Sequence, residues 1–81
     1  MRKKNEEIIC DVVEKIGVLS TTDADWTKEL RRVSWNGGDP KFDIRTWKPG
    51  DERYTKGITL HEDEARELAA LLTKYFEEED K

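Results

Sequence analysis

Hydrophobic and polar positions alternate most regularly in residues 41–47, KFDIRTW. Successive side chains of a strand point to opposite faces, so this pattern predicts a β-strand. One face carries Phe42, Ile44 and Thr46, and the other carries Lys41, Asp43, Arg45 and Trp47. We predict that the first face is core and that the second face meets a ligand.

The apolar positions of residues 8–19, IICDVVEKIGVL, fit two periods. Ile8, Val12 and Leu19 would share one stripe of a helix. Six β-branched residues favour a strand instead, because Val and Ile are stiff at the first side-chain torsion. We therefore predict a long, irregular strand with a bulge near Gly17.

A second strand is predicted over residues 26–35, and it ends at Asn36-Gly37. Asn-Gly is a strong hairpin signal, because both residues accept a positive φ. Leu30 and Val33 differ in parity along this strand, so they cannot face one core without a bulge. The pattern alone does not assign the faces of this strand.

A Pro-Gly turn at residues 49–50 precedes a short fourth strand over residues 54–60, in which Gly57 predicts a bulge or a close backbone approach. From about His61 the apolar residues recur at helical spacing, which predicts an amphipathic helix of about four turns. Its apolar stripe consists of Ala65, Leu68, Ala69, Leu72, Tyr75 and Phe76. His61 stands at the cap position, three residues before Glu64.

The length of 81 residues predicts one small domain with a thin core, which a partner chain would help to stabilise. Residues 1–7 are predicted to be a flexible lead-in, residues 8–76 the folded domain and residues 77–81 an acidic tail.

Composition narrows the function classes. No apolar run approaches roughly 18 residues, so we predict no membrane segment. The single cysteine, Cys10, cannot form an intrachain disulfide, which fits a reducing cytoplasm. We find no metal-ligand spacing, phosphate-cradling loop or nucleophile motif, and therefore predict a protein that is not an enzyme and uses no metal or cofactor.

Residues 26–58 interleave cations with aromatic rings. They contain all three tryptophans, and their eight cationic side chains outnumber five carboxylates, a local charge of +3 in a chain of net charge −4. Nucleic-acid bases stack on such rings while Lys and Arg neutralise the phosphates. The leading hypothesis is therefore binding of single-stranded nucleic acid, and single-stranded DNA is the preferred candidate ligand.

The order of segments over residues 16–75 resembles a known family. A basic strand ending in VSW is followed by an Asn-Gly turn, KFDIRTW, a Pro-Gly turn, KGITL and an acidic amphipathic helix. This order resembles the transcriptional coactivator p15 (positive cofactor four) single-stranded DNA-binding domain, particularly its short bacterial YdbC-like members. The resemblance implies a homodimer whose strands form a groove for single-stranded DNA, with Arg45, Trp47 and Lys56 in the binding region.

We therefore predict an α+β fold, a four-stranded antiparallel sheet followed by one C-terminal amphipathic helix (β-β-β-β-α), in a homodimer. It would bind single-stranded DNA with little sequence preference, in transcription regulation or DNA replication and repair, in a bacterial cytoplasm and associated with the nucleoid. The predicted DNA-binding residues are the cations and aromatic residues of the two central strands and the lysine before Gly57: Lys28, Arg31, Arg32, Trp35, Lys41, Phe42, Arg45, Trp47 and Lys56.

Other interpretations stay open at this point. Stacking on rings does not distinguish DNA from RNA, so single-stranded RNA is an alternative ligand. Trp and Arg are also frequent in protein hot spots, so the same face would suit an adaptor that docks an acidic protein segment. A purely structural interpretation makes the tryptophans core residues and pairs cations with carboxylates, as in Arg45 with Asp43.

Overall fold

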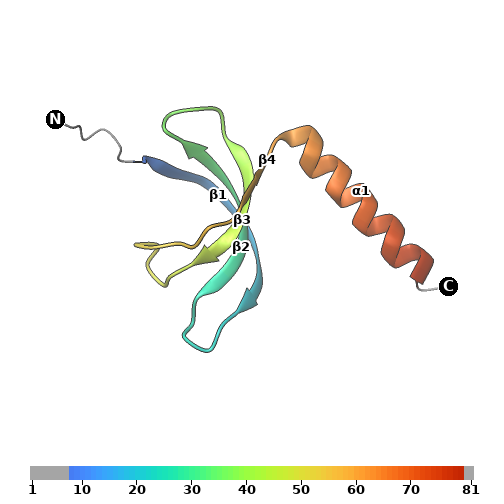
Figure 1. Cartoon of the computed structure of the whole chain (residues 1–81), viewed down its shortest axis with the longest axis horizontal. Helices are drawn as coiled ribbons and strands as arrows, with labels where there is room; N and C mark the ends of the chain where they lie inside the picture. Colours follow the sequence, from blue (N-terminus) through green and yellow to red (C-terminus); the bar gives the residue numbers. More distant parts are fainter. Residues whose placement is uncertain (1–7, 80–81) are drawn as a thin grey trace.

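The computed structural model describes residues 8–79 and has the predicted α+β architecture (Figure 1). Four strands pair antiparallel in the order of the chain, and one helix follows them. The elements are β1 (Cys10–Thr21), β2 (Thr27–Trp35), β3 (Lys41–Trp47), β4 (Ile58–Leu60) and α1 (Glu62–Glu79). The predicted lead-in, residues 1–7, lies outside the described residues, as do residues 80–81.

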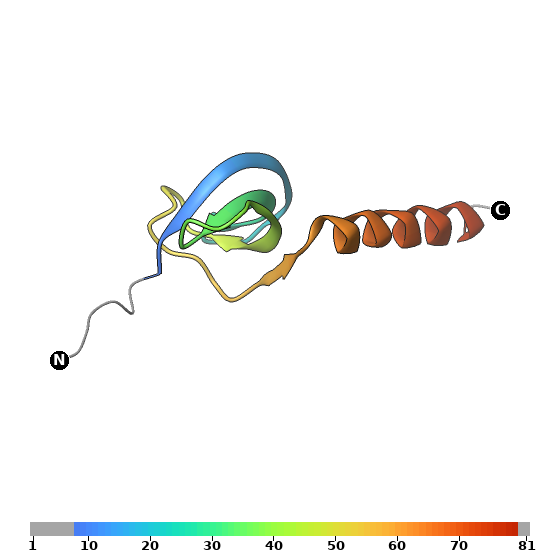
Figure 2. The ribbon, with the colours of Figure 1, turned by 90° about the horizontal axis from the view of Figure 1, so that it is seen from above.

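The first of the four strands is long, irregular and strongly bent. Its pairing with β2 shifts register three times, between Val12 and Glu14, between Lys15 and Gly17, and between Val18 and Ser20. At each shift β1 has one residue more than β2, as in a β-bulge, and bulges bend a strand and increase its twist. Figure 2 shows β1 as an arch beside the other strands, so the sheet is curled and one of its faces is concave.

The pairing of β2 with β3 is regular, and it resolves the face assignment of β2. Leu30 pairs with Ile44 and Val33 with Lys41, without a register shift. Leu30 and Ile44 line the face that looks toward α1, whereas Val33 is fully buried on the concave face. The two apolar residues of opposite parity therefore serve two different faces, and β2 needs no bulge.

The predicted division of β3 into a core face and an open face is wrong. The side chains buried most completely are those of Trp47, Arg31, Val33 and Asp43. Trp47 and Asp43 belong to the face of β3 that was expected to meet a ligand, and Arg31 and Val33 lie beside that face on β2, paired with Asp43 and Lys41. They are covered because the sheet curls and because residues 48–56, between β3 and β4, fold back over the concave face: Tyr54 forms an isolated bridge with Trp47. The other face, with Phe42 and Ile44, lines an apolar groove.

The turn between β2 and β3 has the geometry that its Asn-Gly sequence predicts. Asn36 and Gly37 both have positive φ, 54° and 78°, as an Asn-Gly hairpin requires. The Asn36 side chain also accepts a hydrogen bond from the backbone N–H of Ile9 at 2.9 Å. This contact ties the start of β1 to the β2–β3 hairpin.

The helix α1 begins one residue after His61 and ends at Glu79, past the predicted domain boundary at residue 76. The Glu64 carboxylate accepts a hydrogen bond from the backbone N–H of His61 at 2.8 Å, one half of a capping box. The helix projects away from the sheet (Figures 1 and 2), and none of its described residues is buried. Between Cys10 and Glu79, no helix is long and apolar enough to cross a membrane.

Candidate nucleic-acid interface

Aromatic rings and guanidinium groups are layered on the concave face. The Arg31 guanidinium lies 4.0 Å from the centroid of the Trp47 ring, and the Arg45 guanidinium lies 4.7 Å from that of Trp35. Tyr54 joins the two tryptophans, with its ring centroid 4.9 Å from Trp47 and 5.8 Å from Trp35. Cations held over aromatic faces gain about 0.5–2 kcal/mol each, more when they are desolvated. The concave face is therefore an ordered aromatic and cationic cluster.

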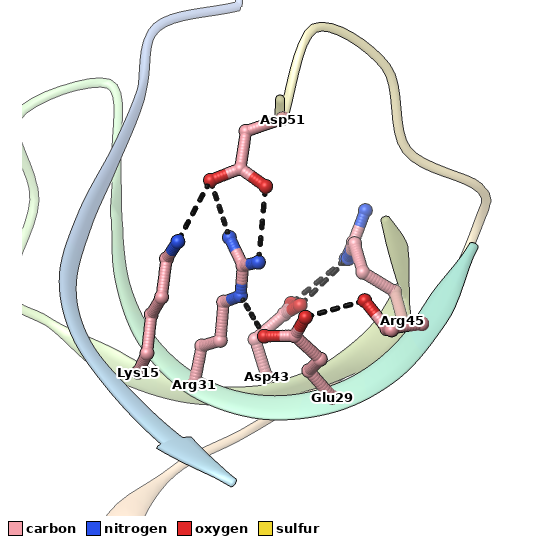
Figure 3. Close-up of polar contacts among 7 residues, drawn as sticks. Lys15, Glu29, Arg31, Asp43, Arg45 and Asp51 are labelled. Carbon is pink, nitrogen blue, oxygen red and sulfur yellow. Dashed lines mark hydrogen bonds and ion pairs between the residues drawn. The ribbon is translucent and has the colours of Figure 1, made fainter. Parts of the chain in front are cut away.

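Carboxylates neutralise the more deeply buried arginine of this cluster. Arg31, whose side chain is only 1% exposed, donates from Nε to Glu29 at 2.8 Å and from its two terminal nitrogens to Asp51 at 3.1 and 3.2 Å. Lys15 lies 3.3 Å from the same Asp51 carboxylate. Figure 3 shows these side chains on the inner side of the curved strands. The hydrogen bonds from Arg31 lower the pKa of both Glu29 and Asp51, against the opposing effect of burial.

Arg45 forms a second ion pair. Its Nε and one terminal nitrogen donate to the two Asp43 oxygens at 2.6 and 2.8 Å, and the Thr59 hydroxyl of β4 donates to Asp43 at 3.0 Å. Asp43 is fully buried. The ion pair that the structural interpretation predicted for Arg45 is thus present, and it positions the guanidinium over Trp35.

Two indole N–H groups of the cluster lack an acceptor. Nε1 of Trp35 and Nε1 of Trp47 are buried and have no hydrogen-bond partner among residues 8–79. An unsatisfied buried donor costs about 1–3 kcal/mol. Such donors are uncommon in folded proteins.

A shallow groove of about 370 Å³ carries the exposed cations Lys28 and Lys56. Its floor includes Gly57, where a Cβ would collide with the carbonyl oxygen of Ile44 and with the Cβ of Arg45. The close backbone approach predicted at Gly57 is therefore confirmed, and any larger residue would push β4 away from β3. The groove offers two ammonium groups beside a bare stretch of backbone.

The predicted site residues do not form one surface. Arg31, Trp35, Arg45 and Trp47 meet on the concave face, while Lys28 and Lys56 flank the groove. On the face toward α1, the Arg32 guanidinium lies 5.1 Å from the Phe42 ring, and Phe42 lines the apolar groove beside the helix. Lys41, the first residue of β3, pairs with Val33 and is half-buried.

Sequence reasoning missed Tyr54, Asp51, Glu29 and Lys15 as members of the site. Tyr54 carried a usable signal, since it is the aromatic residue of the basic loop between β3 and β4. Asp51 follows Gly50, and both have positive φ, but nothing in the order of residues indicates its partners 20 and 36 positions away. Within residues 8–79, no group of three or more His, Cys, Asp or Glu side chains is arranged to hold a metal ion.

A curled four-stranded sheet with one C-terminal helix, and with rings and cations layered on its inner face, defines a class of small β-β-β-β-α domains. The chain belongs to the family described as Transcriptional Coactivator p15 (PC4), whose family model matches residues 22–71. This family is known for nucleic-acid binding and transcription coactivation. The chain is also 40% identical over 68 residues to an uncharacterized protein of Treponema pallidum (strain Nichols). The aligned residues cover 84% of this chain and 80% of that protein.

Proposed function

We propose that this protein binds single-stranded DNA with little sequence preference. The observation that carries the proposal is the layer of rings and guanidinium groups on the concave face, in a chain of a family that binds single-stranded DNA. Trp35 and Tyr54 are half-buried and offer ring surface to bases. Trp47, only 2% exposed, supports Tyr54 from below.

Phosphates would be neutralised by the exposed cations of the neighbouring groove. Lys28 and Lys56 flank the groove in which Gly57 leaves the backbone bare, so a strand can approach closely there. Arg45 lies between that groove and the Trp35 ring. A stacked base contributes about 1–3 kcal/mol, so two half-exposed rings supply a substantial part of the affinity.

The test is a titration with oligothymidine of about 20 nucleotides, followed by tryptophan fluorescence at two salt concentrations. We expect saturable quenching by the single strand, an affinity that falls steeply with salt because bound phosphates release counterions, and much weaker binding of a matched duplex.

Replacing Lys28 and Lys56 together by alanine should reduce both the affinity and the salt slope, whereas Lys74→Ala on the helix should change neither. A salt-independent signal, or equal binding of the duplex, would refute the proposal, and competition with a matched RNA strand distinguishes the two nucleic acids.

We further propose that the protein acts as a homodimer. The groove beside α1 has a volume of about 520 Å³ and a lining that is almost wholly apolar, including Leu30, Ile44 and Leu68. Farther along the helix, the side chains of Leu71, Leu72, Tyr75 and Phe76 are 49–59% exposed. One chain thus carries both an apolar groove and an apolar helix stripe, which a two-fold arrangement of two copies would bury together. A dimer mass in light scattering tests this proposal.

A further inference from the structure

Residues 48–56, which we call the strap, connect β3 to Gly57 and β4 across the concave face. Only Lys48, Asp51 and Tyr54 of the strap are even half-buried, and its other residues are exposed. Two backbone hydrogen bonds flank Tyr54: the N–H of Thr55 donates to the carbonyl of Thr46 at 2.9 Å, and the N–H of Lys48 donates to the carbonyl of Arg53 at 3.0 Å. Between Lys48 and Arg53, the Asp51 carboxylate ties the strap to β1 and β2.

Asp51 occupies an anion position made by two other strands. Arg31 of β2 offers it two parallel N–H donors, and Lys15 of β1 offers an ammonium group. A guanidinium fork with a neighbouring ammonium group is also the arrangement that recognises a phosphate. Lys15 is 61% exposed and the Asp51 side chain 34%, so an anion from solution can reach this position.

Two neighbouring residues of the strap have positive φ, Asp51 at 66° and Gly50 at 89°. Glycine adopts this region without a steric penalty, whereas Asp tolerates it at a cost of up to about 1 kcal/mol. Ion pairs with Arg31 and Lys15 offset this cost. If another anion took the carboxylate's place, that support would be lost and the loop would relax.

We propose that Lys15 and Arg31 form a phosphate site that Asp51 occupies in the free protein, and that a phosphate of the bound strand displaces Asp51 and opens the strap. This inference rests on the proposed function. The exchange replaces one anion with another, so the charges of Lys15, Glu29 and Arg31 stay balanced. Opening lifts residues 49–52 from Arg31, which lies over the Trp47 ring, while the backbone hydrogen bonds of Lys48 and Thr55 keep Tyr54 beside Trp47.

The decisive variant is Asp51→Asn, which keeps the size of the side chain and its tolerance of positive φ but removes the competing charge. Glu52→Gln is the matched control, because it removes the same charge from the neighbouring strap residue, whose carboxylate pairs with Lys48. For oligothymidine, we expect Asp51→Asn to tighten binding about tenfold relative to wild type, and Glu52→Gln by less than about twofold. Without DNA, acrylamide should quench tryptophan fluorescence more strongly in Asp51→Asn than in Glu52→Gln.

The outcomes separate this inference from the proposed function. If the wild-type protein does not bind oligothymidine, the proposed function fails. If it binds, but Asp51→Asn binds no tighter than Glu52→Gln, Asp51 is not a competitor and the inference is overturned. Weaker binding by an Asp51→Asn protein whose circular dichroism is native would also overturn it, because the carboxylate would then support the binding conformation. Lys15→Gln provides a second test: it should weaken binding in the Asp51→Asn background, where the phosphate site is open.

Discussion

Asp43 keeps a charge inside a very thin core. Its carboxylate is fully buried and accepts two hydrogen bonds from Arg45 and one from Thr59. A buried carboxylate is tolerated only when it is paired and hydrogen-bonded in this way. The pair also fixes the Arg45 guanidinium over Trp35, so one buried residue of β3 connects stability to the candidate interface.

Replacing Asp43 by Asn should therefore destabilise the fold. The change leaves Arg45 without its counter-charge next to the aromatic cluster, and removing one partner of a buried ion pair costs about 3 kcal/mol or more. Urea unfolding followed by tryptophan fluorescence measures the loss. Asp39→Asn, at an exposed loop position, is the control and should unfold like wild type; equal midpoints for both variants would show that the buried pair contributes nothing.

Low pH should lower the free energy of unfolding, because Glu29 and Asp51 become protonated. Both have a pKa below the ordinary values of 4.5 and 3.8, because Arg31 donates hydrogen bonds to them. A lowered folded-state pKa contributes stability above the ordinary value, and that contribution is lost as pH falls through the folded-state value. The urea midpoint should hardly change from pH 7 to about 5 and should fall below about pH 4. In the double variant Glu29→Gln, Asp51→Asn this decline should be shallower; an unchanged decline would assign it to other carboxylates.

At the scale of the elements, β4 depends on one glycine. Only three residues, Ile58–Leu60, form this strand, and just before it the backbone at Gly57 runs directly against Ile44 and Arg45. A short edge strand of this kind has few ladder hydrogen bonds to compensate for any displacement. A larger residue at position 57 would displace the backbone that forms the floor of the groove between Lys28 and Lys56.

Gly57→Ala should displace β4 and weaken both the fold and the binding of single-stranded DNA. Forcing a methyl group into a closely packed position costs about 1–3 kcal/mol. Gly17→Ala in β1 is the matched control, because a Cβ there meets nothing within 4 Å. Denaturant midpoints and oligothymidine affinities of the two variants test this, and a Gly57→Ala protein as stable as the control would contradict the close packing.

At the scale of the whole molecule, the described chain leaves much apolar surface uncovered. Large hydrophobic residues are exposed along both β1 and α1, among them Val18, Leu19, Leu71 and Phe76. A monomeric protein rarely exposes a large contiguous apolar patch. The helix touches the sheet only near β3 and β4, so its distal half has no partner within residues 8–79.

Phe76→Asp should convert the proposed dimer to a monomer. Phe76 is 55% exposed and does not line the groove beside α1, so the substitution should leave the fold of one chain intact while placing a charge in the dimer contact. Lys74→Asp, which adds a carboxylate to the helix outside its apolar stripe, is the control. Light scattering should give a monomer mass for Phe76→Asp and a dimer mass for Lys74→Asp; a monomeric wild-type protein would refute the dimer.

The elements and their order follow from local signals in the sequence. The Asn-Gly turn, the alternation in KFDIRTW and the helical spacing after His61 predicted two strands, a hairpin and a helix, because each signal depends on neighbours within a few residues. The family was also evident in the sequence, from KFDIRTW and KGITL in their order, and the matching family model confirms it.

Which face of the sheet is covered depends on the folded arrangement of the strands and the strap. Three register shifts in β1 curl the sheet, and the strap returns across it through contacts of Asp51 with Arg31 and Lys15. These partners are far apart in the chain, and no local pattern encodes their meeting. Trp47 therefore became a buried support and Tyr54 a site residue, since exposure depends on what folds over a strand and not on the alternation along it.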